Sequence, residues 1–117
     1  ISKQTITDEI MKRAEYLIEF VGLSKYKNNL SSNLSGGQQQ RVAIARSLMN
    51  QPKIILADEP TGNLDSDTTN QIYDLFRKIN QTFQTTFIII THDQSIAQRA
   101  DRIIEIKDGK IHMDVSK

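Results

Sequence analysis

The 117-residue sequence contains no cysteine, which excludes a disulfide framework and a thiolate metal site. It has no apolar run near the ~18–20 residues that a membrane-spanning helix needs, and no signal peptide. Fifteen basic and fourteen acidic side chains leave a net charge of +1, so no electrostatic footprint for nucleic acid is present. The length predicts one domain or part of one, and these absences predict a cytoplasmic chain without a nucleic-acid partner.

A phosphate-binding loop of the form G-x-x-x-x-G-K-[ST] is also absent. The one Gly-Lys pair, Gly109-Lys110, continues with isoleucine and lies in an expected hairpin. The chain therefore has no backbone cradle or lysine for the β- and γ-phosphates of a nucleotide. Because residue 1 is isoleucine rather than methionine, we expect a processed or truncated piece of a longer protein.

The remaining composition is that of a soluble globular chain, with 25% charged and 38% hydrophobic residues. Apolar residues at helical spacing predict a helix over 7–21, begun by Thr7 and Asp8 and stopped at Gly22, with Ile10 on its buried face. A polar loop is expected at 31–33.

Two more helices follow from capping signals and apolar spacing. Ser35 is the expected N-cap of a helix over 35–49, and Asp65 or Ser66 begins another. The apolar stripe of this last helix consists of Ile72, Leu75, Phe76 and Ile79.

Short apolar segments at 54–57 and 85–91 are expected to be strands buried on both faces, as in a parallel sheet. A brief helix over 95–100 follows. Asp108-Gly109 predicts a hairpin between strands at 102–107 and 110–113. The order α-α-β-α-β-α-β-β indicates an α/β fold in which helices flank a mostly parallel sheet with an antiparallel edge.

Polar side chains follow both expected parallel strands. Asp58 and Glu59 come after the first, and Thr91, His92 and Asp93 after the second. Parallel sheets bind ligands beyond the carboxyl ends of their strands. Carboxylates for Mg²⁺ and a water, with an imidazole for a phosphate, are what phosphoryl transfer needs. The alternative for an isolated Asp-Glu pair is that it begins a solvated turn.

The amino-acid sequences of these segments also resemble those of a known family. LSGGQQQR and ARSL in residues 34–48, ILADEPTGNLD in residues 55–65 and IIITHD in residues 88–93 resemble the ATP-binding subunit of ABC transporters. Residues 34–38 look like the signature motif, 54–58 like the Walker B strand and 63–65 like the D-loop. The sequence DEPTGNLD resembles the branch of this family that serves lipoprotein release, macrolide export and cell-division complexes. The resemblance implies a partial P-loop NTPase domain.

The resemblance also implies roles for individual residues. The implied catalytic residues are Glu59, which orients or deprotonates water, and His92, which contacts the γ-phosphate. Asp58 would bind Mg²⁺ through water. The implied ATP-contacting residues, which meet the ATP of a partner subunit, are Ser35, Gly36, Gly37 and Gln38. The glycines would permit close backbone approach to the phosphate. Asp65 would signal between two sites, or serve equally well as an N-cap.

The chain would then be the C-terminal portion of one ATPase domain, without Walker A and Q-loop. Residues 1–50 would form part of the helical subdomain and the signature helix, and residues 51–117 the catalytic part. Implied cofactors are ATP and Mg²⁺, and implied partners are a second ATP-binding subunit and membrane-spanning subunits. The location would be peripheral, on the cytoplasmic face of the membrane. Two alternatives stay open: a soluble ABC-type ATPase of DNA repair or chromosome organisation, and a non-catalytic dimerisation module.

Overall fold

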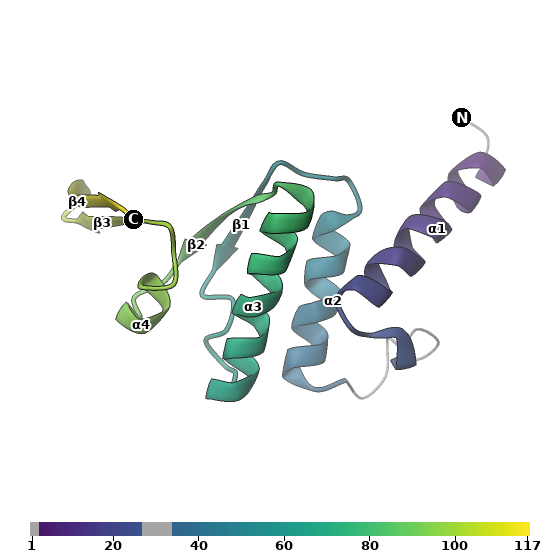
Figure 1. Ribbon diagram of the computed structural model, residues 1–117, viewed down its shortest axis with the longest axis horizontal. Helices are drawn as coiled ribbons and strands as arrows, with labels where there is room; N and C mark the ends of the chain where they lie inside the picture. The colour runs from purple at the N-terminus through teal and green to yellow at the C-terminus, as the bar shows by residue number, and fades with distance from the viewer. Residues whose placement is uncertain (1–2, 27–33) are drawn as a thin grey trace.

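A computed structural model of the protein describes residues 3–26 and 34–117. Its elements are α1 (Lys3–Phe20), η1 (Ser24–Tyr26), α2 (Gly36–Leu48), β1 (Ile54–Asp58), α3 (Ser66–Phe83), β2 (Thr86–Ile90), α4 (Gln94–Ala97), β3 (Arg102–Lys107) and β4 (Lys110–Ser116). Figure 1 shows α1, α2 and α3 in succession, then the β1–β2 pair, with α4 and the β3–β4 hairpin at the far end. The predicted order of elements is confirmed, and the predicted loop at 31–33 lies outside the described residues.

The core lies between the three long helices and one face of the β1–β2 pair. The predicted stripe of α3 is confirmed, because Ile72, Leu75, Phe76 and Ile79 are all buried. The buried residues that face it come from α1 and the turn that follows it, and from α2: Leu17 in α1, Val21 directly after α1, and Ile44, Ala45 and Leu48 in α2. Burying one such large apolar side chain contributes about 1.5–3 kcal/mol, so this cluster is the main source of stability.

Helix α1 differs from its predicted start. It begins at Lys3 rather than near Thr7, since no glycine or proline interrupts residues 3–20. Ile10 was expected on the buried face but is 46% exposed, because only the C-terminal half of α1 packs on the core. The predicted stop is confirmed: Gly22 has φ +83° and the Arg41 guanidinium donates to the Val21 carbonyl at 2.7 Å.

Strands β1 and β2 pair in parallel, with Ile54 opposite Thr86 and Asp58 opposite Ile90. Both strands were predicted to be buried on both faces, and this is wrong for the described part of the chain. Only the face toward α3 is covered. The other face presents Ile54, Leu56, Ile88 and Ile90 at 49–67% exposure, because no described element packs over it.

The hairpin was expected to form the antiparallel edge of the same sheet. Instead β3 and β4 pair with each other and form a separate two-stranded sheet. Asp108 (φ +53°) and Gly109 (φ +74°) form the tight turn between them, as the Asp-Gly pair predicts. β4 runs to Ser116, beyond the predicted end at Met113.

Candidate functional site

The carboxyl ends of β1 and β2 meet at one edge of the parallel pair, and the predicted Glu59–His92 cluster lies there. The Glu59 N–H donates to the Ile90 carbonyl at 2.8 Å, which extends the strand pairing by one residue. Glu59 itself adopts φ +45°, a left-handed conformation that is uncommon for a non-glycine residue. This turn directs the chain away from the sheet directly after the carboxylate.

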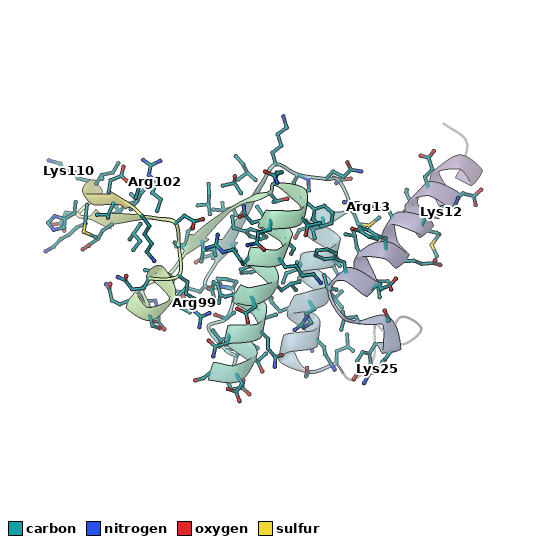
Figure 2. All side chains as sticks on the ribbon, viewed as in Figure 1. Lys12, Arg13, Lys25, Arg99, Arg102 and Lys110 are labelled. Carbon is teal, nitrogen blue, oxygen red and sulfur yellow. The ribbon has the colours of Figure 1, made fainter. Side chains whose placement is uncertain are left out.

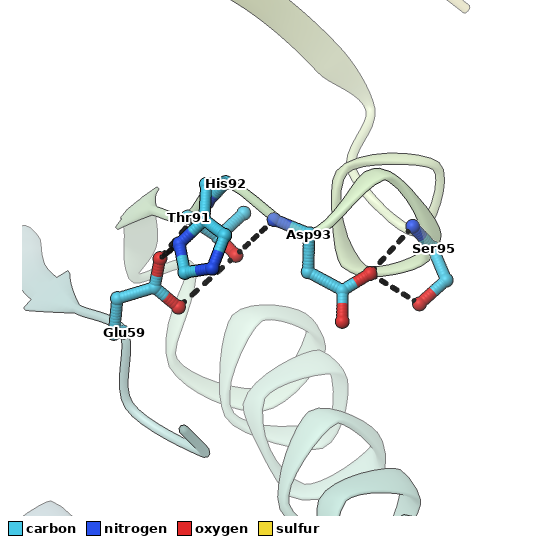
Figure 3. A network of polar contacts seen from close by, with 5 residues as sticks. All are labelled: Glu59, Thr91, His92, Asp93 and Ser95. Carbon is cyan, nitrogen blue, oxygen red and sulfur yellow. Dashed lines mark hydrogen bonds and ion pairs between the residues drawn. The ribbon is translucent and has the colours of Figure 1, made fainter.

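The Glu59 carboxylate is held by the turn that follows β2 (Figure 3). Its Oε1 accepts from the His92 backbone N–H at 2.8 Å and lies 2.6 Å from His92 Nδ1. Its Oε2 accepts from the Thr91 hydroxyl at 3.2 Å. The pKa of Glu59 lies below its usual value, chiefly because its carboxylate accepts from the His92 backbone N–H. Partial burial opposes this lowering of the pKa, and the His92 imidazole adds to it. The carboxylate is therefore ionised at neutral pH.

An ionised carboxylate can only accept hydrogen bonds, so His92 Nδ1 must carry the proton that lies between them. The opposite ring nitrogen, Nε2, is then free to accept a hydrogen bond or, when the ring is charged, to donate one. The His92 side chain is 93% exposed. The ring is thus fixed at one nitrogen and open to a ligand at the other.

The turn after β2 is stabilised by its own side chains. The Thr91 hydroxyl, besides donating to Glu59, accepts from the Asp93 N–H at 3.0 Å. Asp93 Oδ1 accepts from the N–H and the hydroxyl of Ser95 at 2.8 and 2.6 Å. These Ser95 hydrogen bonds lower the Asp93 pKa. Thr91 is therefore a link between Glu59 and the backbone turn at His92, a contact that sequence spacing alone did not predict.

Asp58 is the last residue of β1 and is exposed at the same edge. Within residues 3–26 and 34–117, no group of three or more His, Cys, Asp or Glu side chains could enclose a metal ion. Magnesium usually keeps several waters and binds through one or two carboxylates together with substrate phosphates. The donor set fits a cation held jointly with a nucleotide and not an all-protein metal site.

The predicted N-cap of α2 is confirmed as a complete capping box. The Gln38 N–H donates to Ser35 Oγ at 3.2 Å, and the Ser35 N–H donates to Gln38 Oε1 at 2.9 Å. These reciprocal bonds satisfy two backbone donors of the first turn. No described residue accepts from the N–H groups of Gly36 and Gly37. They fit an anion at the positive end of the helix dipole.

The two glycines also have a packing role that the sequence did not reveal. A Cβ on Gly37 would lie 2.5 Å from Thr68 Cγ2, and one on Gly36 would lie 3.0 Å from Leu64 Cδ2. The first turn of α2 is thereby packed against the loop before α3 and against the first turn of α3. The two glycines were expected to let the backbone come close to a phosphate. In the structure they also let the first turn of α2 come close to Leu64 and Thr68.

Asp65 is the N-cap of α3, one of the two predicted possibilities. Its Oδ1 accepts from the Thr68 N–H at 2.7 Å. Hydrogen bonding to Thr68 lowers the Asp65 pKa, so this carboxylate is also ionised at neutral pH. Because Thr68 lies against Gly37, the N-cap of α3 and the signature-like turn are adjacent.

A cavity of about 630 Å³ lies between α2 and the end of β1. The predicted site residues Gly36, Asp58 and Glu59 line it. Its other walls come from Gln39, Gln40, Ala43, Asn63 and Leu64, among others. Ser35, Gln38, Asp65 and His92 do not line it. The structure thus brings Glu59 and His92 into contact and separates them from the first turn of α2 by a cavity.

Comparison with known proteins identifies the family. The family model described as "ABC transporter" matches residues 2–62, which is more than half of the chain. The chain belongs to the ABC transporter family.

Two curated ABC transporter relatives are close in sequence. The chain is 53% identical over 100 residues to the lipoprotein-releasing system ATP-binding protein LolD 1 of Rhodopseudomonas palustris, covering 86% of this chain and 44% of that protein. It is 49% identical over 107 residues to the macrolide export ATP-binding/permease protein MacB of Rhodopirellula baltica, covering 92% of this chain and 16% of that protein. The chain thus spans less than half the length of these relatives.

A solved structure agrees with the sequence relatives. The dimeric post-hydrolysis state of the ATP-binding cassette MJ0796, bound to ADP and Pi, superposes with a TM-score of 0.74 at 42% identity. The match covers 99% of this chain and 49% of that cassette. The fold is therefore part of an ABC ATPase fold, a small parallel sheet with helices and an antiparallel hairpin. Among the described residues, no helix has the length and apolar character to span a bilayer.

Proposed function

We propose that the protein to which this chain belongs is the ATP-binding and ATP-hydrolysing subunit of an ABC transporter of the exporter or lipoprotein-release type. The observation that carries the proposal is the ionised Glu59 carboxylate, fixed at the end of β1 by Thr91 and His92. An ionised, oriented carboxylate beside an open imidazole suits the activation of water for phosphoryl transfer. The names of the LolD and MacB relatives support the branch.

Each site residue has a role that its geometry supports. Glu59 would orient or deprotonate the attacking water, and His92 Nε2 would contact the γ-phosphate. Asp58 would hold Mg²⁺ through water at the same edge of the sheet. When bound, Mg²⁺ would offset the negative charge of the phosphates.

The first turn of α2 would act on a different ATP, that of a second ATP-binding subunit. The N–H groups of Gly36 and Gly37, from which no described residue accepts, would meet its γ-phosphate together with Ser35 and Gln38. Asp65, which begins α3 next to this turn, would transmit the state of one site to the other. The dimeric form of the MJ0796 cassette supports this arrangement.

The domain division that we propose has two parts. Residues 1–50 form part of the helical subdomain and the signature helix, which would dock on membrane-spanning subunits. Residues 51–117 form the Walker B, D-loop and switch part of the catalytic core. The subunit would lie on the cytoplasmic face of the membrane.

The first test is the coding frame upstream of Ile1. A strand followed by G-x-x-x-x-G-K-[ST] and a glutamine loop would support the transport ATPase. In the protein expressed from that frame, Glu59→Gln should lower the ATP hydrolysis rate by about 10²–10³-fold, a typical loss for one catalytic electrostatic contact. Asp74→Asn, on the exposed side of α3, is the matched control. An unchanged rate in Glu59→Gln would overturn the proposal.

The 117-residue chain alone should hydrolyse ATP no faster than its own Glu59→Gln variant. It lacks the phosphate loop, and positioning of the phosphates supplies much of phosphoryl-transfer catalysis. Phosphate release assayed on both proteins decides this, and turnover clearly above the variant would contradict it.

A further inference from the structure

The side chain of Thr91 lies between the Glu59 carboxylate and the backbone turn that carries His92 (Figure 3). A threonine hydroxyl has one proton to donate and lone pairs that can accept. The Thr91 hydroxyl donates to Glu59 Oε2 at 3.2 Å and accepts from the Asp93 N–H at 3.0 Å. Two consecutive backbone N–H groups therefore hold the carboxylate, that of His92 directly and that of Asp93 through the Thr91 hydroxyl.

The two carboxylate oxygens of Glu59 differ in how many of their acceptor positions are filled. Oε1 accepts from the His92 N–H at 2.8 Å and lies 2.6 Å from His92 Nδ1. Among the described residues, Oε2 has the Thr91 hydroxyl as its only hydrogen-bond partner. A carboxylate oxygen accepts about two hydrogen bonds, so Oε1 is filled and Oε2 has one position open. Since the Glu59 side chain is 36% exposed, solvent has access to it, and Oε2 is the oxygen with room for a water.

No arginine or lysine in the described part of the chain pairs with the Glu59 carboxylate, whose only basic partner there is His92. Arg99 lies beside α4 (Figure 2) but donates to the Asn70 amide oxygen on α3. Because His92 holds only Oε1, the rotation of the carboxylate depends on the group that holds Oε2. That group is the Thr91 hydroxyl.

The contact between Thr91 and Asp93 is, by itself, a common turn in which a threonine hydroxyl bonds to the backbone two residues later. Such a turn would stabilise residues 91–93 and have no effect on Glu59. The bond from the same hydroxyl to Glu59 Oε2 goes beyond this, because it joins the turn to a residue 32 positions away. Valine would have a similar shape at this position but could make neither bond, so the hydroxyl is the group to test.

We propose that Thr91 is a positioning residue that fixes the rotation of the Glu59 carboxylate and thereby leaves Oε2 facing the attacking water. This inference rests on the proposed function, in which Glu59 activates that water. Oε1, already held twice by His92, has no acceptor position left for the water. Thr91 acts only through Glu59 and needs no contact with the nucleotide or the cation.

The first experiment measures amide hydrogen exchange by NMR, without nucleotide, in the protein expressed from its whole reading frame. Thr91→Val removes the hydroxyl and keeps the branched shape, whereas Thr91→Ser keeps the hydroxyl. Thr86→Val, at the exposed opposite end of β2, is the matched control. Thr91→Val should speed exchange of the His92 and Asp93 amides about 2- to 10-fold relative to the core amide of Ile79, the range for one hydrogen bond. Thr91→Ser and Thr86→Val should change neither amide.

The His92 amide is the critical probe. Its acceptor, Glu59 Oε1, is still present in Thr91→Val, so faster exchange there indicates that the carboxylate has become free to rotate. The Ser95 amide, which donates to Asp93, should not change. Faster exchange at Asp93 alone would overturn the proposal, because Thr91 would then stabilise only the turn, and equal acceleration at Ser95 would overturn it as a general loosening.

Two further results of this experiment bear on the hydroxyl itself. No change at either amide in Thr91→Val would overturn the proposal, and so would a Thr91→Ser protein that behaves like Thr91→Val. Where Thr91→Val is too unstable to measure, Thr91→Ala removes the same hydroxyl and should give the same pattern of exchange.

The second experiment measures ATP hydrolysis. In an active subunit, Thr91→Val should lower kcat about 2- to 10-fold and leave KM unchanged, since only the orientation of the base is affected. In a Glu59→Gln background, Thr91→Val should lower kcat no further, because a residue that acts through Glu59 has no effect once the base is absent. An equal loss in both backgrounds would overturn the proposal.

The two experiments together separate this inference from the proposed function. If the wild-type subunit does not hydrolyse ATP but the exchange pattern appears, the proposed function fails and the hold of Thr91 on Glu59 stands. If the subunit is active and the exchange pattern is absent, the inference about Thr91 fails alone.

Discussion

At the scale of single residues, Gly37 lies where the first turns of α2 and α3 meet. A methyl group there would approach Thr68 Cγ2 to 2.5 Å, well inside van der Waals contact. Gly37→Ala should therefore destabilise the chain by about 1–3 kcal/mol, the usual cost of overpacking, despite the better helix propensity of alanine. Denaturant unfolding of the two proteins measures the difference.

Rescue makes this prediction specific. Thr68→Ser removes Cγ2, so Gly37→Ala combined with Thr68→Ser should recover most of the lost stability. Gly62→Ala, where the nearest atom would be 3.5 Å away, is the control and should be nearly neutral. A Gly37→Ala protein as stable as the original would show that the two turns can separate at little cost.

At the scale of elements, α3 depends on the N-cap at Asp65. Asp65→Ala removes the acceptor of the Thr68 N–H and should lower the unfolding midpoint by a few degrees. Asp65→Asn should retain most of the stability because it can still accept this bond. Asp74→Ala, an exposed aspartate within the same helix, should change the midpoint little in a thermal melt.

The same N-cap predicts a pH dependence. Hydrogen bonding to Thr68 makes the Asp65 pKa lower in the folded chain than its usual value. Its contribution to stability is therefore complete above the unfolded pKa and is lost as the pH falls through the folded pKa. The stability difference between the original chain and Asp65→Ala should accordingly shrink below pH 4. A difference that stays constant down to pH 2 would contradict this.

At the scale of the whole molecule, the outer face of the β1–β2 pair has no described element packed over it. It exposes four large apolar side chains, and parallel strands are ordinarily covered on both faces. The 117-residue chain alone should therefore self-associate in a concentration-dependent way. Sedimentation velocity over a range of concentrations measures this, and a sharp, cooperative melt of a monomer would count against it.

Paired substitutions locate the surface responsible. Leu56→Gln with Ile88→Gln, on the outer face of the sheet, should shift the chain toward monomer. Ile104→Gln with Ile106→Gln, on the exposed hairpin, is the matched control with the same change in polarity. Monomer formation by the hairpin pair alone would place the association surface on β3–β4 instead.

Much of this architecture could be predicted because its signals are local. Ser35 was predicted as an N-cap and serves as one, and of the two predicted caps of α3, Asp65 and Ser66, the structure uses Asp65. A cap can be predicted because it needs only a side-chain oxygen and the next turn of helix. The stripe of α3 was predicted from spacing alone. The expectation of strands buried on both faces was wrong because burial depends on which elements are present to cover a face. The same reason explains the exposure of Ile10.

The sequence by itself determined the family, the order of the elements and the residue types at the ends of β1 and β2, because motifs and caps act over a few neighbouring residues. Only the tertiary structure decided that Glu59 accepts from Thr91 and His92, about thirty positions away. The same holds for Gly37 against Thr68 and for Arg99 over the ring of Tyr73. Such contacts depend on strand register and helix packing, which fix distances between segments that the order of residues leaves free.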